Sequence, residues 1–169
     1  MEKEFSAPIC IAQALIALME NTPINDIRIQ AIIKKAGVSR MSYYRYFTNK
    51  KDVLRYYMDH IIEEYCEQID GKDGSSFQSY EHVLKALQFF YKYRDFILCL
   101  DHADMAGIVL EGLNRYVEKQ QAFAEGNTYS FYFYAGALYN VYMQWISKGA
   151  VEAPEEIAKM ITENCLNAT

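Results

Sequence analysis

Apolar residues recur along most of this chain at intervals of three and four positions, which is the period of an amphipathic helix. In the first such run Ile11, Leu15 and Leu18 share one face, and the alternation typical of strands is scarce throughout. Only three prolines and eight glycines interrupt the 169 residues. The pattern predicts an all-α protein of about nine helices, expected near residues 6–20, 28–35, 39–47, 50–69, 77–93, 96–100, 104–125, 128–148 and 154–166.

The most specific local signal lies between the second and third predicted helices. Gly37 follows a helical run, and glycine commonly ends a helix there because it accepts the left-handed conformation. Two residues later Ser39 is placed to cap the next helix, and Thr48 to cap the one after it. A helix, a glycine turn and a serine-capped second helix form a helix-turn-helix pattern. The short second helix is rich in arginine and tyrosine, which suits a groove lined with phosphates and base edges.

This stretch resembles the DNA-binding domain of the TetR/AcrR family of bacterial transcriptional regulators. The residues that carry the resemblance are Ala36 to Ser39, Tyr44, Phe47 and Asn49-Lys50. They lie in about the first third of the chain, and the rest resembles the family in helical layout and length. The resemblance implies an N-terminal three-helix DNA-binding domain over residues 1–50. It also implies that a long helix joins this domain to a helical regulatory and dimerisation domain over residues 51–169.

The predicted DNA contacts come from the recognition helix and its flanks. Arg40 lies in the first turn, where a bidentate contact to guanine is worth ~1–3 kcal/mol of discrimination. Met41 or Tyr43 would touch a thymine methyl, although Tyr43 fits equally well as a packing residue. By the resemblance, Tyr44 reaches a phosphate, and Lys50 holds another together with the free N–H groups of the following helix. The full predicted set is Arg28, Ser39, Arg40, Met41, Ser42, Tyr43, Tyr44, Arg45, Tyr46 and Lys50.

Two positions depart from the family pattern. Arg28 stands where a small hydroxyl residue commonly starts the second helix, and arginine reaches a phosphate but does not cap a helix in the same way. Met41 replaces a residue that is often glycine or proline. We expect a repressor that binds a double-stranded DNA operator and that a small molecule releases. The alternative is a coactivator or adaptor of the same shape that binds another protein rather than DNA.

The charge distribution favours nucleic acid at one end of the chain only. The net charge is −5 at pH 7. Residues 1–50 hold seven Lys or Arg against four Asp or Glu, a balance of +3, whereas residues 51–169 hold ten against eighteen, a balance of −8. A basic N-terminal part on an acidic remainder is the asymmetry expected if only that part meets phosphates.

A single recognition helix offers little surface for specificity, so we expect a homodimer that reads two half-sites. The predicted dimer interface lies in the eighth helix, at Tyr132, Gly136, Tyr139 and Trp145, unless this helix is simply a central core helix. The aromatic middle helices would enclose a small apolar or aromatic effector, unless these side chains are ordinary core. The predicted pocket residues are His82, Phe89, Tyr93, His102, Met105, Tyr116 and Phe123.

Other functional classes find less support in the sequence. The run 126–147 has no charge, but tyrosines are spread along it, so we expect a helix buried on most sides and no membrane span. The group 101–104 (Asp-His-Ala-Asp) lacks a known metal-ligand spacing and is interpreted as a helix-start cap. The four scattered cysteines and the acidic N-terminus indicate a cytoplasmic protein with reduced thiols. Neither a cofactor motif nor a nucleophile–base pair is recognised, so no enzyme is expected.

Overall fold

The computed structural model describes residues 6–70, 79–121 and 128–165, and every regular element in these ranges is helical. This confirms the prediction of an all-α fold. The helices are α1 (Ala7–Met19), α2 (Ile29–Ala36), α3 (Arg40–Tyr46), α4 (Lys50–Tyr65), α5 (Tyr80–Tyr91), α6 (Arg94–His102), α7 (Gly107–Gln121), α8 (Thr128–Ser147) and α9 (Pro154–Met160). Short π-helical segments, Cys66–Asp70 and Ile161–Cys165, continue α4 and α9.

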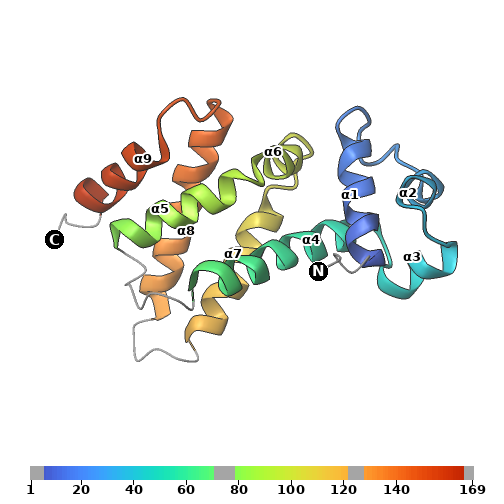
Figure 1. Cartoon of the computed structure of the whole chain (residues 1–169), viewed down its shortest axis with the longest axis horizontal. Coiled ribbons are helices and arrows are strands. Elements are labelled where there is room, and N and C mark those ends of the chain that lie inside the picture. The colour runs from blue at the N-terminus through green and yellow to red at the C-terminus, as the bar shows by residue number, and fades with distance from the viewer. Residues whose placement is uncertain (1–5, 71–78, 122–127, 166–169) are drawn as a thin grey trace.

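Helices α1, α2 and α3 form a head at one end of the molecule, and α4 leads from this head to a body made of α5 to α9 (Figure 1). In the head, α1 packs against α2, α3 and α4. The fully buried side chains of these helices include Ile11, Leu15, Ile32, Tyr43, Val53 and Leu54. Burial of one such side chain contributes ~1.5–3 kcal/mol, so packing on its neighbours holds the short α3 in place.

Two ion pairs connect α4 to α7, and thereby the head to the body. The Nε atom of Arg55 lies 2.9 Å from Oε2 of Glu111, and Nε of Arg115 donates to Oδ1 of Asp59 at 3.0 Å. Hydrogen bonding to the Arg55 guanidinium lowers the pKa of Glu111. Because all four side chains are partly exposed, each pair stabilises the fold by no more than about 1 kcal/mol. Their main effect is to orient α7 on α4.

Between the two ion pairs, α7 approaches α4 closely at Gly112. A Cβ atom at this position would lie 2.9 Å from Cγ of Met58, whose side chain is fully buried and has no room to move aside. Any larger residue at position 112 would therefore push the two helices apart. This contact, together with the ion pairs, sets the register of α7 along α4.

Aromatic side chains fill the core of the body. The ring of Tyr65, at the end of α4, lies 5.2 to 5.8 Å from the rings of Phe89, Phe90 and Tyr116, measured between centroids. The Tyr65 hydroxyl lies 2.8 Å from Nε2 of the buried His82. The far end of α4 is thus part of the body core, just as its near end is part of the head.

The start of α4 differs from the prediction in its capping residue. Asn49, not Thr48, caps the helix: its Oδ1 accepts a hydrogen bond from the Asp52 N–H at 3.0 Å. The Asp52 carboxylate in turn accepts from the Asn49 N–H at 3.2 Å and from the Thr48 N–H at 3.3 Å. In this reciprocal capping box Asn49 takes the role predicted for Thr48, so the prediction that Thr48 caps the helix was wrong.

Two helix starts in the body also differ from the prediction. Helix α5 begins at Tyr80 instead of residue 77, because the Ser79 hydroxyl accepts from the His82 N–H and caps the helix there. The group 101–104 ends α6 and starts no helix, since Asp104 has a φ of 56° and α7 begins only at Gly107. The interpretation of this group as a helix-start cap was therefore wrong.

Helix α8 contains most of the charge-free run near the C-terminal end of the chain. Most of its described residues are buried or partly buried, as expected, but one side is open, where Tyr129 is 81% and Phe133 75% exposed. In the ranges that the structure describes, none of the helices is both long and apolar enough to cross a membrane.

Candidate nucleic-acid interface

The turn between α2 and α3 has the predicted geometry. Gly37 ends α2 in the left-handed conformation, with a φ of 67°, and its N–H donates to the carbonyl of Ile33. The Ser39 hydroxyl accepts from the Ser42 N–H at 3.0 Å and caps α3. A side chain at position 37 would be strained by the positive φ although the space around it is open. The turn thus fixes the angle at which α3 leaves α2.

Helix α3 has one buried and one exposed face. Tyr43 is fully buried and Phe47, just past the helix end, is 4% exposed, and their rings lie 6.0 Å apart between centroids. The exposed residues of α3 are Arg40, Met41, Tyr44, Arg45 and Tyr46. Met41 is 84% exposed, which makes it the most exposed large apolar residue among those described.

Two arginines from different helices line one surface groove beside α3. Arg28, immediately before α2, and Arg40 border this groove together with Gln30 and Tyr44. The Arg40 guanidinium carbon lies 5.6 Å from the centre of the Tyr44 ring, a cation–π contact. The sequence interpretation missed Gln30, which only the packing of α2 beside α3 brings to this groove.

Tyr43 is a correction to the predicted set of DNA contacts. Its ring lies in the core of the head, and its hydroxyl is buried with no hydrogen-bond partner among the described residues. Burial raises the pKa of Tyr43. A side chain in this position packs α3 onto the head and does not reach a base.

Lys50 and the start of α4 also differ from the predicted phosphate site. The Lys50 ammonium donates to the carbonyl oxygens of Ile24, Ile27 and Asn25, at 2.9 Å for Ile27 and 3.3 Å for Asn25. The N–H groups of Thr48 and Asn49 bond to the Asp52 carboxylate as described above. The Lys50 ammonium and these two N–H groups are therefore engaged within the head. The spacing Asn-x-x-Asp at 49–52 is a readable capping-box signal that the sequence interpretation did not use.

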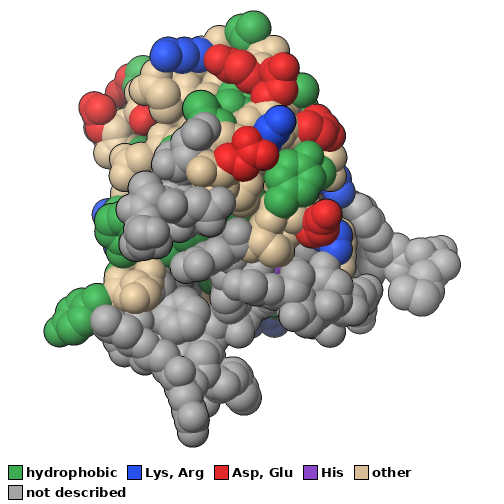
Figure 2. Space-filling model, turned by 90° about the vertical axis from the view of Figure 1, so that its left-hand side faces the viewer, with side chains coloured by type: hydrophobic (Ala, Val, Ile, Leu, Met, Phe, Trp, Pro, Cys, Tyr) green, Lys and Arg blue, Asp and Glu red, His purple; other side chains and the backbone are tan. Residues whose placement is uncertain are grey.

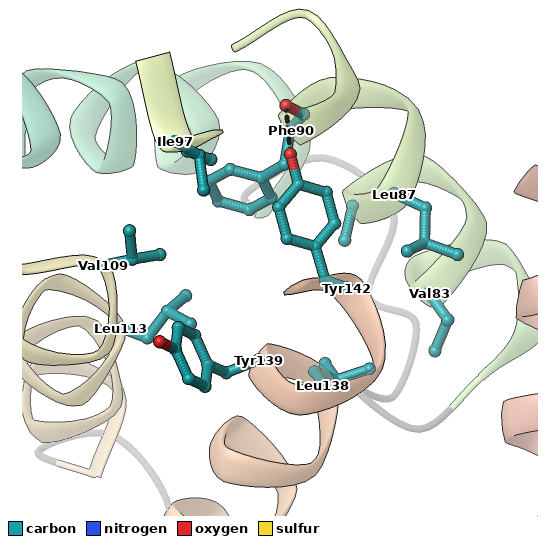
Figure 3. A pocket seen from close by; sticks show the side chains of 10 residues that line it. Val83, Leu87, Phe90, Ile97, Val109, Leu113, Leu138, Tyr139 and Tyr142 are labelled. Carbon is teal, nitrogen blue, oxygen red and sulfur yellow. Dashed lines mark hydrogen bonds between the residues drawn. The ribbon is translucent and has the colours of Figure 1, made fainter. Parts of the chain in front are cut away.

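The body contains an apolar cavity of about 70 Å³, bordered by α5, α6, α7 and α8 (Figure 3). Its lining residues are Val83, Ala86, Leu87, Phe90, Ile97, Val109, Leu113, Leu138, Tyr139 and Tyr142. The Tyr142 hydroxyl donates to the Phe90 carbonyl at 2.8 Å, and the Tyr139 hydroxyl to the Ala106 carbonyl at 3.4 Å. The cavity therefore presents almost entirely hydrocarbon.

None of the six predicted pocket residues that the structure describes lines this cavity. His82, Phe89 and Tyr116 are core residues around Tyr65. Tyr93 donates to Glu64, and His102 borders a different groove, between α6 and the α1–α2 turn. Met105 is partly buried against the core, and Phe123 lies outside the described residues. The aromatic residues chosen from the sequence therefore pack in the core or line another groove, and the cavity is bordered by a different set of aliphatic and aromatic side chains.

The predicted dimer residues divide between the inside and the surface of the body. Trp145 is 3% exposed and donates to the Glu152 carbonyl, and Tyr139 lines the cavity, so both serve the interior of one chain. The Tyr132 hydroxyl donates to Glu118 on α7. Gly136 remains open, since a Cβ atom there would meet nothing within 4 Å. On the same side of α8, Phe133 was missed, although it follows Tyr129 by one helical turn.

Metal or thiol chemistry has no support in the part of the chain that the structure describes. No group of three or more His, Cys, Asp or Glu side chains that could hold a metal ion occurs there. Cys10 and Cys99 are free and partly buried, and burial raises the pKa of Cys99. The group 101–104 therefore lies in no such cluster, and it does not have the predicted capping role.

Comparison with known proteins agrees with this geometry. Residues 11–57 match the sequence profile of the family described as "Bacterial regulatory proteins, tetR family". The chain is also 23% identical over 180 residues to a curated protein, the "Uncharacterized HTH-type transcriptional regulator YxbF" of Bacillus subtilis (strain 168). This match covers 94% of the chain and 44% of the relative, so the chain spans less than half the length of that curated relative.

Solved structures of three regulators share the fold. The fatty acid degradation regulator FadR from Bacillus halodurans has a TM-score of 0.66 and 19% identity, and the match covers 99% of this chain and 98% of that chain. The dihydroxyacetone kinase operon activator DhaS has a TM-score of 0.62 and 18% identity, with 96% of each chain covered. NalD, the secondary repressor of the MexAB-OprM multidrug efflux pump in Pseudomonas aeruginosa, has a TM-score of 0.60 and 19% identity, with 95% of each chain covered. At these identities the likeness concerns the fold alone.

The described elements define a helix-turn-helix protein with a helical body. Residues 11–57 match the TetR family of bacterial regulatory proteins, which confirms the resemblance seen in the sequence. This is a family of transcriptional regulators and not of enzymes.

The burial of Tyr43 leads to a stability prediction. Replacing Tyr43 by Phe should raise the free energy of unfolding by roughly 1 kcal/mol, because the change removes a buried, unpartnered hydroxyl and keeps the ring. Tyr44→Phe is the matched control on the exposed face and should leave stability within about 0.5 kcal/mol. Urea denaturation measures both. A clear loss of stability in Tyr43→Phe would show that the hydroxyl has a partner in solution.

Proposed function

We propose that this protein represses transcription by binding operator DNA as a homodimer, and that a small uncharged apolar molecule releases it. The single observation that carries the proposal is the exposed face of α3. Met41 has no packing role within the chain, and in a major groove it would meet a thymine methyl. Arg40, one residue earlier, is exposed beside it and suits guanine.

The position of the charges supports the same orientation on DNA. The exposed cations of α2 and α3 with their immediate flanks are Arg28, Lys34, Lys35, Arg40 and Arg45. Figure 2 shows the opposite end of the molecule, where Asp and Glu side chains gather on the described surface of the body. A polyanion such as DNA would be attracted to the first surface and repelled by the second.

The two arginines of the groove should differ in what they contribute. Arg40→Ala is expected to reduce affinity for the operator about 5- to 150-fold, with little change on random duplex, because the lost contact reads a base. Arg28→Ala should weaken binding to both duplexes by the same factor and lower the log–log salt slope by about 0.9, because one phosphate contact is lost. Fluorescence anisotropy at several salt concentrations, on a duplex selected from a random pool, measures both.

Two outcomes would contradict this assignment. Equal losses on operator and random duplex in both variants would mean that Arg40 does not read a base. Failure of the unaltered protein to bind any duplex in dilute salt would favour the alternative, an adaptor that binds another protein.

The proposed dimer uses the exposed side of α8. Phe133 and Tyr129 form an apolar surface, and Gly136, one turn farther along, leaves room for another helix to come close. Aromatic residues beside a small residue are typical of the buried centre of an interface. A second copy would cover this surface and place two recognition helices on one side of the assembly for two half-sites.

Phe133→Glu should convert the dimer to a monomer, since it would place a carboxylate at the centre of the apolar interface. The matched control is Met41→Glu, at another strongly exposed apolar residue, in the head, and it should leave the dimer intact. Sedimentation velocity measures the mass of both variants. A monomeric unaltered protein, or a Phe133→Glu variant that is still dimeric at micromolar concentration, would exclude this interface.

The cavity in the body is the proposed effector site. Both tyrosine hydroxyls at its wall already donate to backbone carbonyls, so a charged ligand would lose its hydration without gaining a partner. Val109 and Leu113 of α7 line the cavity, while Glu111 and Arg115 of the same helix bond to α4. A ligand that displaces α7 would therefore move α4 and, with it, the head.

Benzene serves as a neutral probe of this cavity. It should raise the midpoint of thermal unfolding, because a ligand that binds only the folded state stabilises it, whereas benzoate at the same concentration should not. Ala86→Leu fills the cavity and should abolish the benzene effect, while Ala31→Leu, an exposed position of α2, should preserve it. Equal stabilisation by benzoate, or a benzene effect that survives Ala86→Leu, would place the ligand elsewhere.

A further inference from the structure

We propose that Tyr44 is a positioning residue for base reading: its ring holds the Arg40 guanidinium in the groove beside α3, so that Tyr44 acts on base discrimination through Arg40. The part of this inference that concerns bases rests on the DNA binding proposed above. The contact between the two side chains belongs to the free protein and can be tested without DNA.

Arg40 and Tyr44 lie about one helical turn apart on α3 and border the same groove. Residues four positions apart are neighbours on a helix surface, and here the guanidinium carbon of Arg40 lies 5.6 Å from the centre of the Tyr44 ring. A cation within about 6 Å of the face of an aromatic ring is attracted to it. At an exposed site this attraction favours the stacked side chain about 2- to 5-fold. The Arg40 guanidinium is therefore held over the ring before DNA arrives.

The Tyr44 ring is in turn held by the core of the head. It meets the Tyr43 ring nearly edge-on, with 5.3 Å between the centroids and an angle of 82° between the planes. This is one of the preferred arrangements of two aromatic rings. Tyr43 is fully buried, whereas Tyr44 is 49% exposed. A continuous series of contacts thus runs from the core of the head through Tyr44 to Arg40.

The stacked position leaves the N–H groups of Arg40 available. A guanidinium stacks through its flat face, and its five N–H donors point outward from its edge. In the described part of the chain, the Arg40 guanidinium forms neither a hydrogen bond nor an ion pair. Arg45 differs, because its Nη2 donates to the Tyr46 hydroxyl at 3.1 Å. Of the two arginines of α3, Arg40 is therefore the one whose donors are free to form a bidentate contact with guanine.

The ring and the hydroxyl of Tyr44 have separable roles. The hydroxyl is the group predicted to reach a phosphate, and the contact with Arg40 uses only the face of the ring. Tyr44→Phe removes the hydroxyl and keeps the ring, so it is the matched control for Tyr44→Leu, which removes the ring. Both changes lie on the exposed face of α3, and the thermal midpoint checks that both variants are folded.

The first experiment tests the contact in the free protein by NMR. The side-chain Nε–H signal of Arg40, assigned by its loss in Arg40→Lys, should be displaced by the ring current in the unaltered protein and in Tyr44→Phe. It should move to the position of a free arginine in Tyr44→Leu, while the signal of Arg45 stays in place. An Arg40 signal that is the same in the unaltered protein and in Tyr44→Leu would overturn the proposal. This result does not depend on DNA binding, so it decides the contact even if the proposed function is wrong.

The second experiment measures discrimination, defined as the affinity for the selected operator divided by the affinity for random duplex. Tyr44→Leu should lower this ratio about 2- to 5-fold, whereas Tyr44→Phe should weaken binding to both duplexes equally and keep the ratio. In an Arg40→Ala background, Tyr44→Leu should no longer change the ratio, because the residue it positions is absent. An unchanged ratio in Tyr44→Leu, or an equal fall in the Arg40→Ala background, would overturn the positioning role.

Discussion

The orientation of the candidate interface depends on the burial of one face of a seven-residue helix. Helix α3 is too short to be stable by itself, so its position is set by what it packs against. Tyr43 and Phe47 supply that packing, and burial of two aromatic rings contributes several kcal/mol by area. With Tyr43 and Phe47 buried, Met41 projects from another side of the helix, and Arg40 and Tyr44 are exposed as well. The chemistry offered to DNA is thus a consequence of core packing.

The connection between the cavity and the head depends on two helices, α4 and α7. Helix α4 takes part in the cores of both the head and the body, so the two cannot move independently of it. Helix α7 contacts α4 with Gly112 and the flanking ion pairs, and it borders the cavity with Val109 and Leu113. Helix α7 therefore contacts both the cavity and α4. Because interiors are close-packed, a ligand larger than the cavity must displace such a helix, which is the mechanical basis of the proposed release.

The features that could be predicted from the sequence are those encoded over a few residues. Gly37 and Ser39 specify the turn by their own backbone preferences, and the resulting helix-turn-helix was found where expected. Helix α8 is apolar on nearly every side, so its sequence did not indicate which residues face inward, and Trp145 and Tyr139 were assigned to the wrong side. The cavity was also missed, because empty space depends on how four helices pack and not on the character of any one residue.

Lys50 illustrates a different limit, because the resemblance identified the right position but implied a different partner. Whether its ammonium meets a phosphate or a carbonyl depends on the conformation of a turn 23 to 26 residues earlier and on the carboxylate of Asp52. With Lys50 engaged in the head, the cations left to meet DNA lie on α2 and α3 with their flanks. A head with so narrow a basic surface neutralises few phosphates, so a single head would bind DNA weakly and with a shallow dependence on salt. Two heads acting together would restore the lost contacts, so the engagement of Lys50 within the head itself favours a dimeric reader of DNA.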